Sequence, residues 1–240
     1  MRCLELTRPT AAENLALDEA LLDEAEQADG PLETLRFWES PEPAVVVGRS
    51  SRIDAEVRRD VCRADGVPIL RRTSGGAAVV TGPGCLMYAL VLSDQRRPRL
   101  RQLDHVHGEV LGRMVEALAS LTPGVRHDGT SDLVLGTRKF SGNSVRRRRG
   151  HILYHGTLLY DFPLPWIDRW LTMPPRTPQY REGRPHDRFV VNVPILAEAI
   201  REALKKVWEA ETPRDDWPAE RTAQLVAEKY ARPEWNENLR

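Results

Sequence analysis

The sequence predicts an α+β fold in which a mixed or mainly antiparallel β-sheet is flanked by helices. Short β-rich runs occur in groups separated by Pro and Gly turns, and an amphipathic helix pattern interrupts them at residues 103–121. Helices and strands do not alternate in the regular way that a parallel sheet requires. No internal repeat divides the chain, so we expect one domain at residues 1–210, followed by a helical tail at 211–240.

The N-terminal half begins with a strong helix signal. Thr10 and Glu13 form a capping-box pattern ahead of an Ala/Leu-rich run that extends to about Ala28, where Gly30-Pro31 ends it. Residues 34–38 and 44–47 are β-rich and are expected to pair with each other. The other expected elements here are a helix at 54–65 and strands at 68–71, 77–80 and 86–92, the last two joined by a tight turn at 81–84.

The C-terminal half is expected to begin with the helix at 103–121, whose apolar side chains recur at helical spacing. Four strands come next in the sequence. After them we expect a short helix at 166–171 and a long, proline-rich surface loop that extends to residue 187. An amphipathic helix is expected at 195–209 and another helix near 218–230. The expected strands are 124–127, 132–135, 139–145 and 151–160.

Composition excludes several classes of protein. The 240 residues include 35 basic and 35 acidic side chains, and a net charge of zero argues against a nucleic-acid binder with a wholly basic surface. The three cysteines, Cys3, Cys62 and Cys85, have no metal-ligand spacing and suit a reducing cytoplasm. No apolar run is long enough for a secretory signal or a membrane span.

Three segments contain residues suited to chemistry. In "RRTSGGAAV", residues 71–79, paired glycines can expose backbone N–H groups to an anion, although an ordinary turn has the same pattern. "DLVLGTRKFSG", residues 132–142, predicts a hairpin that carries Lys139, the single lysine in the first 200 residues. That lysine is either a point charge for a carboxylate or phosphate or an exposed strand residue. In "HILYHGTLLY", residues 151–160, His155 lies in the middle of an expected strand, where a lone histidine is more often a packed, hydrogen-bonded core group than a catalyst. Neither a catalytic triad nor a metal site is expected.

These segments, together with "NLALDEALL" (14–22), "VVVGRSSR" (45–52) and "DRFVVNV" (187–193), resemble the lipoate–protein ligase family. The resemblance covers about residues 10–200 in the family's order. It implies the catalytic fold that this family shares with biotin–protein ligases and octanoyltransferases, which is similar to that of class II aminoacyl-tRNA synthetases. It also implies ATP and Mg²⁺, lipoate or octanoate as substrate, and an acyl-adenylate that is passed to a lysine of a lipoyl carrier domain. Such domains occur in 2-oxoacid dehydrogenase E2 subunits and in glycine cleavage H protein.

The resemblance also implies roles for individual residues. Lys139 would be the active-site lysine that touches the acyl carboxylate and the α-phosphate. Asp132 would lie near the nucleotide and its metal. The acyl group would be bound by Arg71, Arg72, Ser74, Gly75, Gly76, Ala77, Thr81, His155, Gly156 and Thr157. The nucleotide would be bound by Asp132, Ser141, Gly142 and Arg149.

The sequence departs from the family pattern in three places. Ala77 replaces a third glycine, Thr81 replaces a histidine, and too few residues follow position 200 for an accessory domain, so a separate accessory subunit is possible. The turn at 81–84 resembles octanoyltransferases, which use a cysteine thioester. Residues 156–240 contain no cysteine, so Cys62 or Cys85 would have to serve.

A ligase is therefore favoured over a transferase, and Lys139 with the 71–76 loop argues against a relative that has lost catalysis. The four arginines at 146–149 are expected to form a hairpin turn. That turn would face phosphates, an acidic lipoyl domain or solvent. Neither nucleic acid nor a membrane is expected as a partner.

Overall fold

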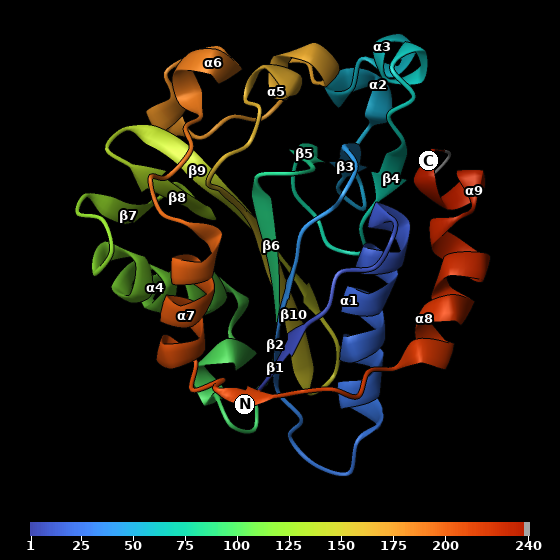
Figure 1. Cartoon of the computed structure of the whole chain (residues 1–240), viewed down its shortest axis with the longest axis vertical. Coiled ribbons are helices and arrows are strands. Elements are labelled where there is room, and N and C mark those ends of the chain that lie inside the picture. The colour runs from blue at the N-terminus through green and yellow to red at the C-terminus, as the bar shows by residue number, and fades with distance from the viewer. Residues whose placement is uncertain (238–240) are drawn as a thin grey trace.

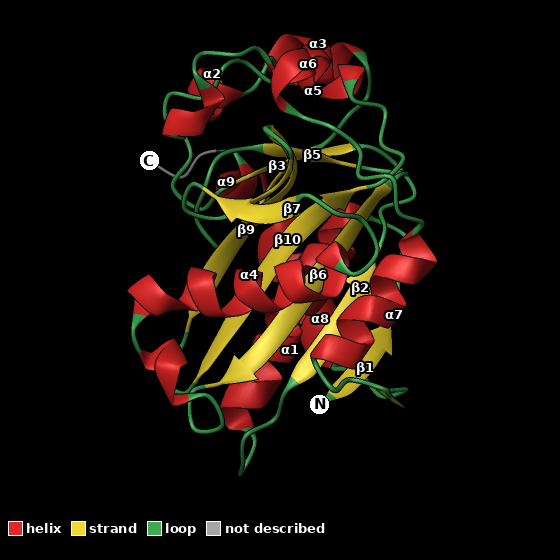
Figure 2. Ribbon diagram, turned by 90° about the vertical axis from the view of Figure 1, so that its left-hand side faces the viewer, coloured by secondary structure: helices red, strands yellow, loops and turns green. Residues whose placement is uncertain are grey.

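The computed structural model describes residues 1–237 and contains two β-sheets with helices around them (Figures 1 and 2). The larger sheet has the order β11-β1-β2-β6-β10-β9-β8-β7 and the smaller sheet the order β4-β3-β5. β1 pairs in parallel with β2 and with β11, and the remaining neighbours in the large sheet are antiparallel, which confirms the mixed α+β fold. The strands are β1 (Arg2–Glu5), β2 (Thr34–Trp38), β3 (Ala44–Val47), β4 (Ile69–Arg71), β5 (Val79–Thr81), β6 (Cys85–Ser93), β7 (Val125–Asp128), β8 (Asp132–Leu135), β9 (Arg138–Arg147), β10 (His151–Leu159) and β11 (Thr212–Pro213).

Helices cover both faces of the large sheet. α1 (Ala11–Gln27) packs on one face, while α4 (Leu103–Ala119) and α7 (Ala197–Val207) pack on the other (Figure 1). The expected capping box is present, because Glu13 N donates to Thr10 Oγ1 at 3.2 Å and Thr10 N donates to Glu13 Oε2 at 3.0 Å. In α4 the apolar positions Val106, Val110, Leu111, Met114 and Leu118 are fully buried, as the spacing predicts.

The shorter helices gather above the small sheet and along α1. The first group is α2 (Ile53–Glu56), α3 (Arg59–Ala64), α5 (Pro165–Trp170) and α6 (His186–Phe189), at the top of Figure 2. The second group is α8 (Ala219–Leu225), a π-helical turn at Val226–Tyr230 and α9 (Pro233–Asn236), which lie beside α1. The tail at 211–237 therefore folds back onto the chain, and the division at residue 210 stays a prediction. No helix in the described part of the chain is long and apolar enough to cross a membrane.

Several expected elements differ from the structure. β2 and β3 do not pair: β2 lies between β1 and β6, and β3 lies in the other sheet, because the segment with Pro41 and Pro43 carries the chain from one sheet to the other. The sequence did not lead us to expect a strand at β1, which has four residues. The expected helix at 54–65 is divided at Val57, which forms a β-bridge to Leu171 instead.

The expected surface loop after residue 171 is in fact partly buried. It contains α6 and a short 3₁₀ turn at Gln179–Arg181, and the side chains of Arg181 and His186 are buried. Val191 N donates to Lys139 O at 2.9 Å, and Lys139 and Val190 form a β-bridge. Proline content suggested exposure, but long-range backbone hydrogen bonds to β9 hold this segment over the sheet.

Candidate active site

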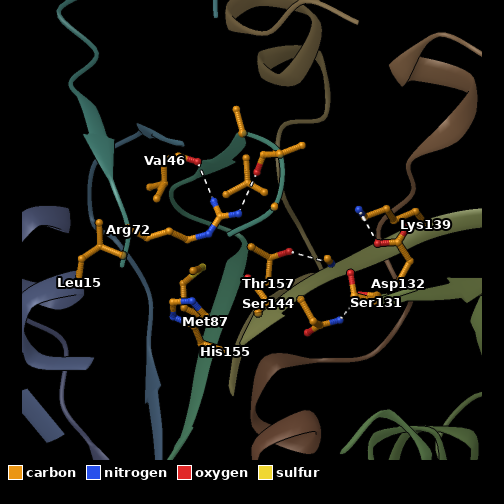
Figure 3. Close-up of a pocket in the computed structure, with 17 residues that line it drawn as sticks. Leu15, Val46, Arg72, Met87, Ser131, Asp132, Lys139, Ser144, His155 and Thr157 are labelled. Atoms are coloured by element: carbon orange, nitrogen blue, oxygen red, sulfur yellow. Dashed lines mark hydrogen bonds and ion pairs between the residues drawn. The ribbon is translucent and has the colours of Figure 1, made fainter. Parts of the chain in front are cut away.

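Two adjoining cavities lie where the large sheet meets the small one. Cavity A is shown in Figure 3: Leu15 and Arg72 lie at one side, Lys139 and Asp132 at the other, and Thr157 between them. Cavity B continues under α5 and α6. The walls of cavity A include Leu15, Val46, Arg72, Gly76, Met87, Asp132, Asn143, Ser144, His155 and Gly156. Those of cavity B include Val80, Phe140, Ser141, Leu159, Ile167, Leu171, Arg181, His186 and Phe189.

The two cavities share one wall segment and one charged side chain. Both are lined by Ala77, Ala78, Val79, Lys139, Gly142 and Thr157. Lys139 is the charged member of that shared set. A ligand in cavity A and a ligand in cavity B would therefore meet beside the same ammonium group.

Lys139 is held by a carboxylate. The β8–β9 hairpin forms as the sequence predicts, with a bulge that places Lys139 next to Asp132. Lys139 Nζ lies 2.7 Å from Asp132 Oδ1, and the Tyr180 hydroxyl donates to Asp132 Oδ2 at 2.8 Å. Burial, and then the nearby Asp132 carboxylate, raise the pKa of Tyr180, so this phenol stays protonated and donates.

The substrate loop, which we define as residues 72–76, is folded around Arg72. The Arg72 guanidinium donates to the carbonyl oxygens of Val46, Gly75 and Ala77. Gly76 has φ +87°, and a Cβ there would lie 2.8 Å from Arg72 Nη2, which explains the glycine. Burial lowers the pKa of Arg72 to about 10, and the Glu56 carboxylate only partly offsets this. Arg72 is thus a buried cation in the wall of cavity A whose hydrogen bonds go to neutral groups.

Cavity B has a comparable cation. Arg181 is buried, donates to Arg184 O at 2.8 Å and lies 3.2 Å from His186 Nδ1. His186 Nε2 is 3.2 Å from Thr172 O, which assigns the imidazole proton to Nε2 and leaves Nδ1 as an acceptor. Burial lowers the pKa values of both Arg181 and His186. A buried guanidinium without a close carboxylate is costly unless its N–H groups are satisfied or an anion accompanies it. Carbonyl oxygens satisfy Arg72, whereas Arg181 bonds one carbonyl and His186, so cavity B is the one suited to an anionic group.

β10 forms the floor beneath cavity A. His155 and Thr157 point to the same face of the strand, and the Thr157 hydroxyl accepts from Gly142 N at 3.2 Å. Gly156 lies between them, opposite Asn143 on β9. Its lack of a side chain lets Asn143 approach, and Asn143 in turn accepts a 2.5 Å hydrogen bond from the Tyr88 hydroxyl.

Gly156→Ala should therefore destabilise the floor. A Cβ at this position would lie 1.8 Å from Asn143 Oδ1 and 2.9 Å from Gly142 O, so β9 and β10 would have to separate. We expect a loss of about 1–3 kcal/mol in the free energy of unfolding, measured by denaturant titration. Gly108→Ala in α4 is the matched control, because nothing lies within 4 Å of that Cβ; equal stability of the two variants would refute the close packing.

Ser74, His155 and Asp18 lie in a row below cavity A. Ser74 Oγ is 2.5 Å from His155 Nε2, and His155 Nδ1 is 3.8 Å from Asp18 Oδ2. The order is that of a hydrolase triad, which we did not expect from the sequence. The histidine–aspartate separation is too long for a hydrogen bond, Ser74 is 1% exposed, and Asp18 already accepts from Arg36 and Trp38. The row is consequently a structural network rather than a nucleophile and its base.

The structure brings most of the expected site residues together. Cavity A is lined by Arg72, Gly76, Ala77, Asp132, Lys139, Gly142, His155, Gly156 and Thr157, and cavity B adds Ser141. Gly75 faces a separate groove beside residues 50–56, and the side chain of Ser74, in the same loop, is buried.

Besides Ser74 and Gly75, three further expected site residues line neither cavity. Arg71 points away from cavity A and donates to the carbonyl oxygens of Gly48, Ser51 and Trp235. Thr81 is fully buried and lines neither cavity. Arg149 follows β9, whose nine residues from Lys139 to Arg147 span about 27 Å, and its backbone N–H donates to Glu26 on α1. The geometry of these three gives no support to contact with a ligand at Lys139.

Sequence reasoning missed several lining residues. Leu15, Val46 and Met87 look like ordinary core positions, and no sequence signal separates them from their buried neighbours. Asn143 follows the Ser-Gly pair of the Lys139 hairpin, so its place on β9 beside Gly142 was a usable signal. Arg181 and His186 were hidden by the proline-rich character of their segment.

The described residues do not form a metal-binding site by themselves. Within residues 1–237 no three His, Cys, Asp or Glu side chains converge as metal ligands. Asp132 supplies one carboxylate, and both of its oxygens already accept from Lys139 and Tyr180. Protein groups alone thus do not fit a bound Mg²⁺ ion, which usually takes one or two carboxylates together with substrate phosphates.

The three cysteines are buried and unpaired. Cys85 is fully buried, and burial raises the pKa of its thiol to about 12. Burial also raises the pKa of Cys62. Neither sulfur lines cavity A or cavity B. A thiolate nucleophile needs a lowered pKa and access to substrate, and these cysteines have neither.

Comparison with families and curated proteins gives a consistent result. A family model described as the lipoyl protein ligase A/B catalytic domain matches residues 10–209. A putative lipoate-protein ligase A from Aeropyrum pernix is 33% identical over 146 residues, which cover 61% of this chain and 52% of that protein. A probable lipoate-protein ligase A from Mycoplasma pneumoniae is 29% identical over 160 residues, or 67% and 45% of the two chains. The chain spans about half the length of these two relatives.

A transferase and two solved structures are also similar. Octanoyltransferase LipM from Symbiobacterium thermophilum is 28% identical over 223 residues, which cover 85% of this chain and 78% of that protein. A structure from the bi-partite lipoate protein ligase system of Thermoplasma acidophilum superposes with a TM-score of 0.83 at 22% identity, covering 100% and 97% of the chains. A lipoate-protein ligase A bound with ATP gives a TM-score of 0.78 at 23% identity, covering 100% and 99%. At these identities the solved structures establish the fold alone.

Proposed function

The chain belongs to the lipoyl protein ligase A/B catalytic-domain family, and from this premise we propose that it is an ATP-dependent lipoate–protein ligase. Lipoate or octanoate would be activated as an acyl-adenylate and passed to a lysine of a lipoyl carrier domain. The observation that carries the proposal is the meeting of two cavities at Lys139. A reaction that joins a carboxylic acid to a nucleotide needs two such subsites with one shared cation.

We assign the acyl chain to cavity A and the nucleotide to cavity B. Leu15, Val46 and Met87 give cavity A an apolar wall remote from Lys139, which suits a hydrocarbon chain whose carboxylate reaches the ammonium group. Cavity B combines the aromatic side chains of Phe140 and Phe189 with the buried Arg181. That combination suits a nucleobase and an anionic phosphate.

The first chemical step would join two anions. A carboxylate oxygen of the acid attacks the α-phosphorus of ATP, the bond from that phosphorus to the bridging oxygen breaks, and pyrophosphate leaves with the electron pair. Lys139 would offset the repulsion between carboxylate and phosphate and stabilise the charge that develops on the phosphoryl oxygens. Because the protein supplies one carboxylate, we propose that Mg²⁺ accompanies the ATP phosphates and that Asp132 is its nearest protein ligand.

The second step would transfer the acyl group. The neutral amine of the acceptor lysine attacks the acyl carbon, AMP leaves with the electron pair, the nitrogen releases a proton to solvent, and an amide forms. Lys139, beside the phosphate, would stabilise the departing AMP. Acceptor domains of the E2 or H-protein type and a separate accessory subunit are proposed as partners. We propose that the protein acts in the cytoplasm, because that compartment contains ATP and would keep the three unpaired cysteines reduced.

A two-arm assay tests the proposal. One sample contains the protein, ATP, Mg²⁺, lipoate and an apo lipoyl domain, and the other contains octanoyl carrier protein without ATP. Intact mass of the domain should rise by one acyl group in the first arm. Acylation in the second arm alone would overturn the ligase function and favour the transferase activity that the name of the LipM relative describes.

Cys85→Ala provides an independent prediction. If no thioester forms on the protein, this variant should acylate the domain at a rate within about two-fold of the wild type, because Cys85 is buried outside both cavities. Cys62→Ala is the matched control. Loss of all transfer in Cys85→Ala with an unchanged melting temperature would indicate cysteine catalysis instead.

A further inference from the structure

Residues near the C-terminus hold the strand from which the substrate loop departs. We define the C-terminal clamp as Lys229, Tyr230, Trp235 and Asn236. The segment that carries them contacts α1 through residues 226–230 and β4 through α9, and its ribbon lies beside the blue helix in Figure 1. None of them lines cavity A or cavity B. Their hydrogen bonds nevertheless reach Arg71 directly and Thr73 through Glu19, and these two residues flank Arg72.

The first half of the clamp completes the free edge of β4. β4 has three residues and one strand neighbour, β3, so Arg71 would otherwise present unpaired backbone groups at the sheet edge. Asn236 Oδ1 accepts from Arg71 N at 3.0 Å, and Trp235 Nε1 donates to Arg71 O at 2.8 Å. Arg71 Nε donates to Trp235 O at 3.0 Å. The Asn236 and Trp235 side chains thereby bond the backbone groups of Arg71 that a neighbouring strand would bond. The Trp235 carbonyl oxygen holds the Arg71 side chain.

The second half of the clamp acts through Glu19 on α1. Lys229 Nζ lies 2.6 and 2.8 Å from the two carboxylate oxygens of Glu19, and the Tyr230 hydroxyl donates to Oε2 at 2.7 Å. Thr73 Oγ1 lies 3.4 Å from Glu19 Oε1. Burial alone would raise the pKa of Glu19, but Lys229 and Tyr230 hold it below its usual value, so the carboxylate is ionised.

The two halves are tied together. Asn236 Nδ2 donates to Tyr230 O at 2.8 Å, and Lys229 Nζ lies 4.0 Å from the centre of the Trp235 ring. Tyr230 and Trp235 pack edge to face with ring centres 6.4 Å apart. The clamp consequently contacts Arg71 directly and Thr73 through Glu19, so both neighbours of Arg72 are connected to one network.

We propose that the C-terminal clamp positions the substrate loop for binding of the acyl chain, so that Lys229, Tyr230, Trp235 and Asn236 are positioning residues for cavity A. The reason is geometric. Arg72 and Gly76 form the wall of cavity A, and the loop has no helix or long strand of its own to hold it. A displacement of about 1 Å at a positioning element can reduce a reaction about 100-fold. The assignment of cavity A to the acyl chain rests on the proposed function.

The test compares Asn236→Ala with Lys206→Met, an exposed lysine on α7, in the full chain. In Asn236→Ala we expect the KM for lipoate to rise about ten-fold while the KM for ATP changes less than about two-fold. Trp235→Phe keeps the ring against Tyr230 and Lys229 but removes the Nε1 donor, and it should shift the KM for lipoate in the same direction. Parallel changes in both KM values, or none, would overturn the positioning role.

Hydrogen exchange provides a readout that needs no substrate. Backbone amides at residues 71–76 should exchange faster in Asn236→Ala than in Lys206→Met, while amides of α4 exchange equally in both. Equal protection of 71–76 in the two variants would refute the clamp, as would a uniform loss of protection across the chain. Because this measurement is independent of ATP and acyl transfer, failure of the ligase proposal would not be mistaken for failure of the clamp.

Discussion

Lys139→Met should slow adenylate formation by about 10²–10³-fold. The substitution removes the single charged group that both cavities share, while it keeps a side chain of similar length. Loss of one preorganised electrostatic contact to a developing charge typically lowers kcat by about 10²–10³. Lipoate-dependent exchange of labelled pyrophosphate into ATP is the measurement, since it reports the first step without an acceptor. Lys206→Met on exposed α7 is the matched control and should exchange at the wild-type rate.

A second variant separates chemistry from damage to the site. Lys139→Met leaves the largely buried Asp132 carboxylate without its partner at 2.7 Å, and that alone could distort the hairpin. Lys139→Met combined with Asp132→Asn removes both charges. Because Asp132 is itself proposed as a Mg²⁺ ligand, Asp132→Asn alone is the reference. If Lys139 acts on the substrates, the double variant exchanges more slowly than Asp132→Asn although its melting temperature recovers. Recovery of exchange in the double variant would show that the single substitution acted through Asp132.

Asp18→Ala should have the largest effect on stability. Asp18 Oδ1 lies 2.5 Å from Arg36 Nη1, and both side chains are at most 2% exposed. Burial lowers the pKa of Arg36 and Asp18 opposes that shift, so the carboxylate is what keeps this guanidinium compatible with the core. Removal of one partner of a buried pair costs about 3–5 kcal/mol. For a chain of this size that corresponds to a fall in melting temperature of roughly 6–20 °C.

The control for Asp18 is an ion pair at the surface. Asp216 pairs with Arg2 at 2.6 Å, but the two side chains are 62% and 43% exposed. Asp216→Ala should change the melting temperature little, because water screens such a pair. Scanning calorimetry compares the two variants directly. Similar melting temperatures for Asp18→Ala and Asp216→Ala would mean that the Arg36 network does not stabilise the fold as its burial implies.

The sequence was most informative where local rules decide the structure. The capping box starts α1, the 3.6-residue stripe forms α4, and the glycine turn before Lys139 forms the β8–β9 hairpin. Lys139, His155 and Thr157 line the same cavity because β9, which carries Lys139, pairs with β10, which carries the other two. The local pattern was enough to find the centre of the candidate site.

Long-range packing decided what the sequence left open. β2 and β3 have the same β-rich composition, and only tertiary contacts assign them to different sheets. Arg71 and Arg72 are adjacent, yet one faces the C-terminal clamp and the other faces cavity A. Which of two consecutive strand residues faces a ligand depends on what packs against each side of the strand. Here Trp235, 164 residues along the chain from Arg71, packs against the Arg71 side.

A titration with an acyl-sulfamoyl-adenosine tests most directly whether cavities A and B form one adenylate site. This stable analogue joins an octanoyl chain to adenosine through a group that mimics the phosphate. Calorimetry should show one analogue bound per chain, far more tightly than octanoate or AMP alone, and Lys139→Met should weaken that binding. An analogue that binds no more tightly than octanoate alone would contradict a site in which the two cavities meet at Lys139.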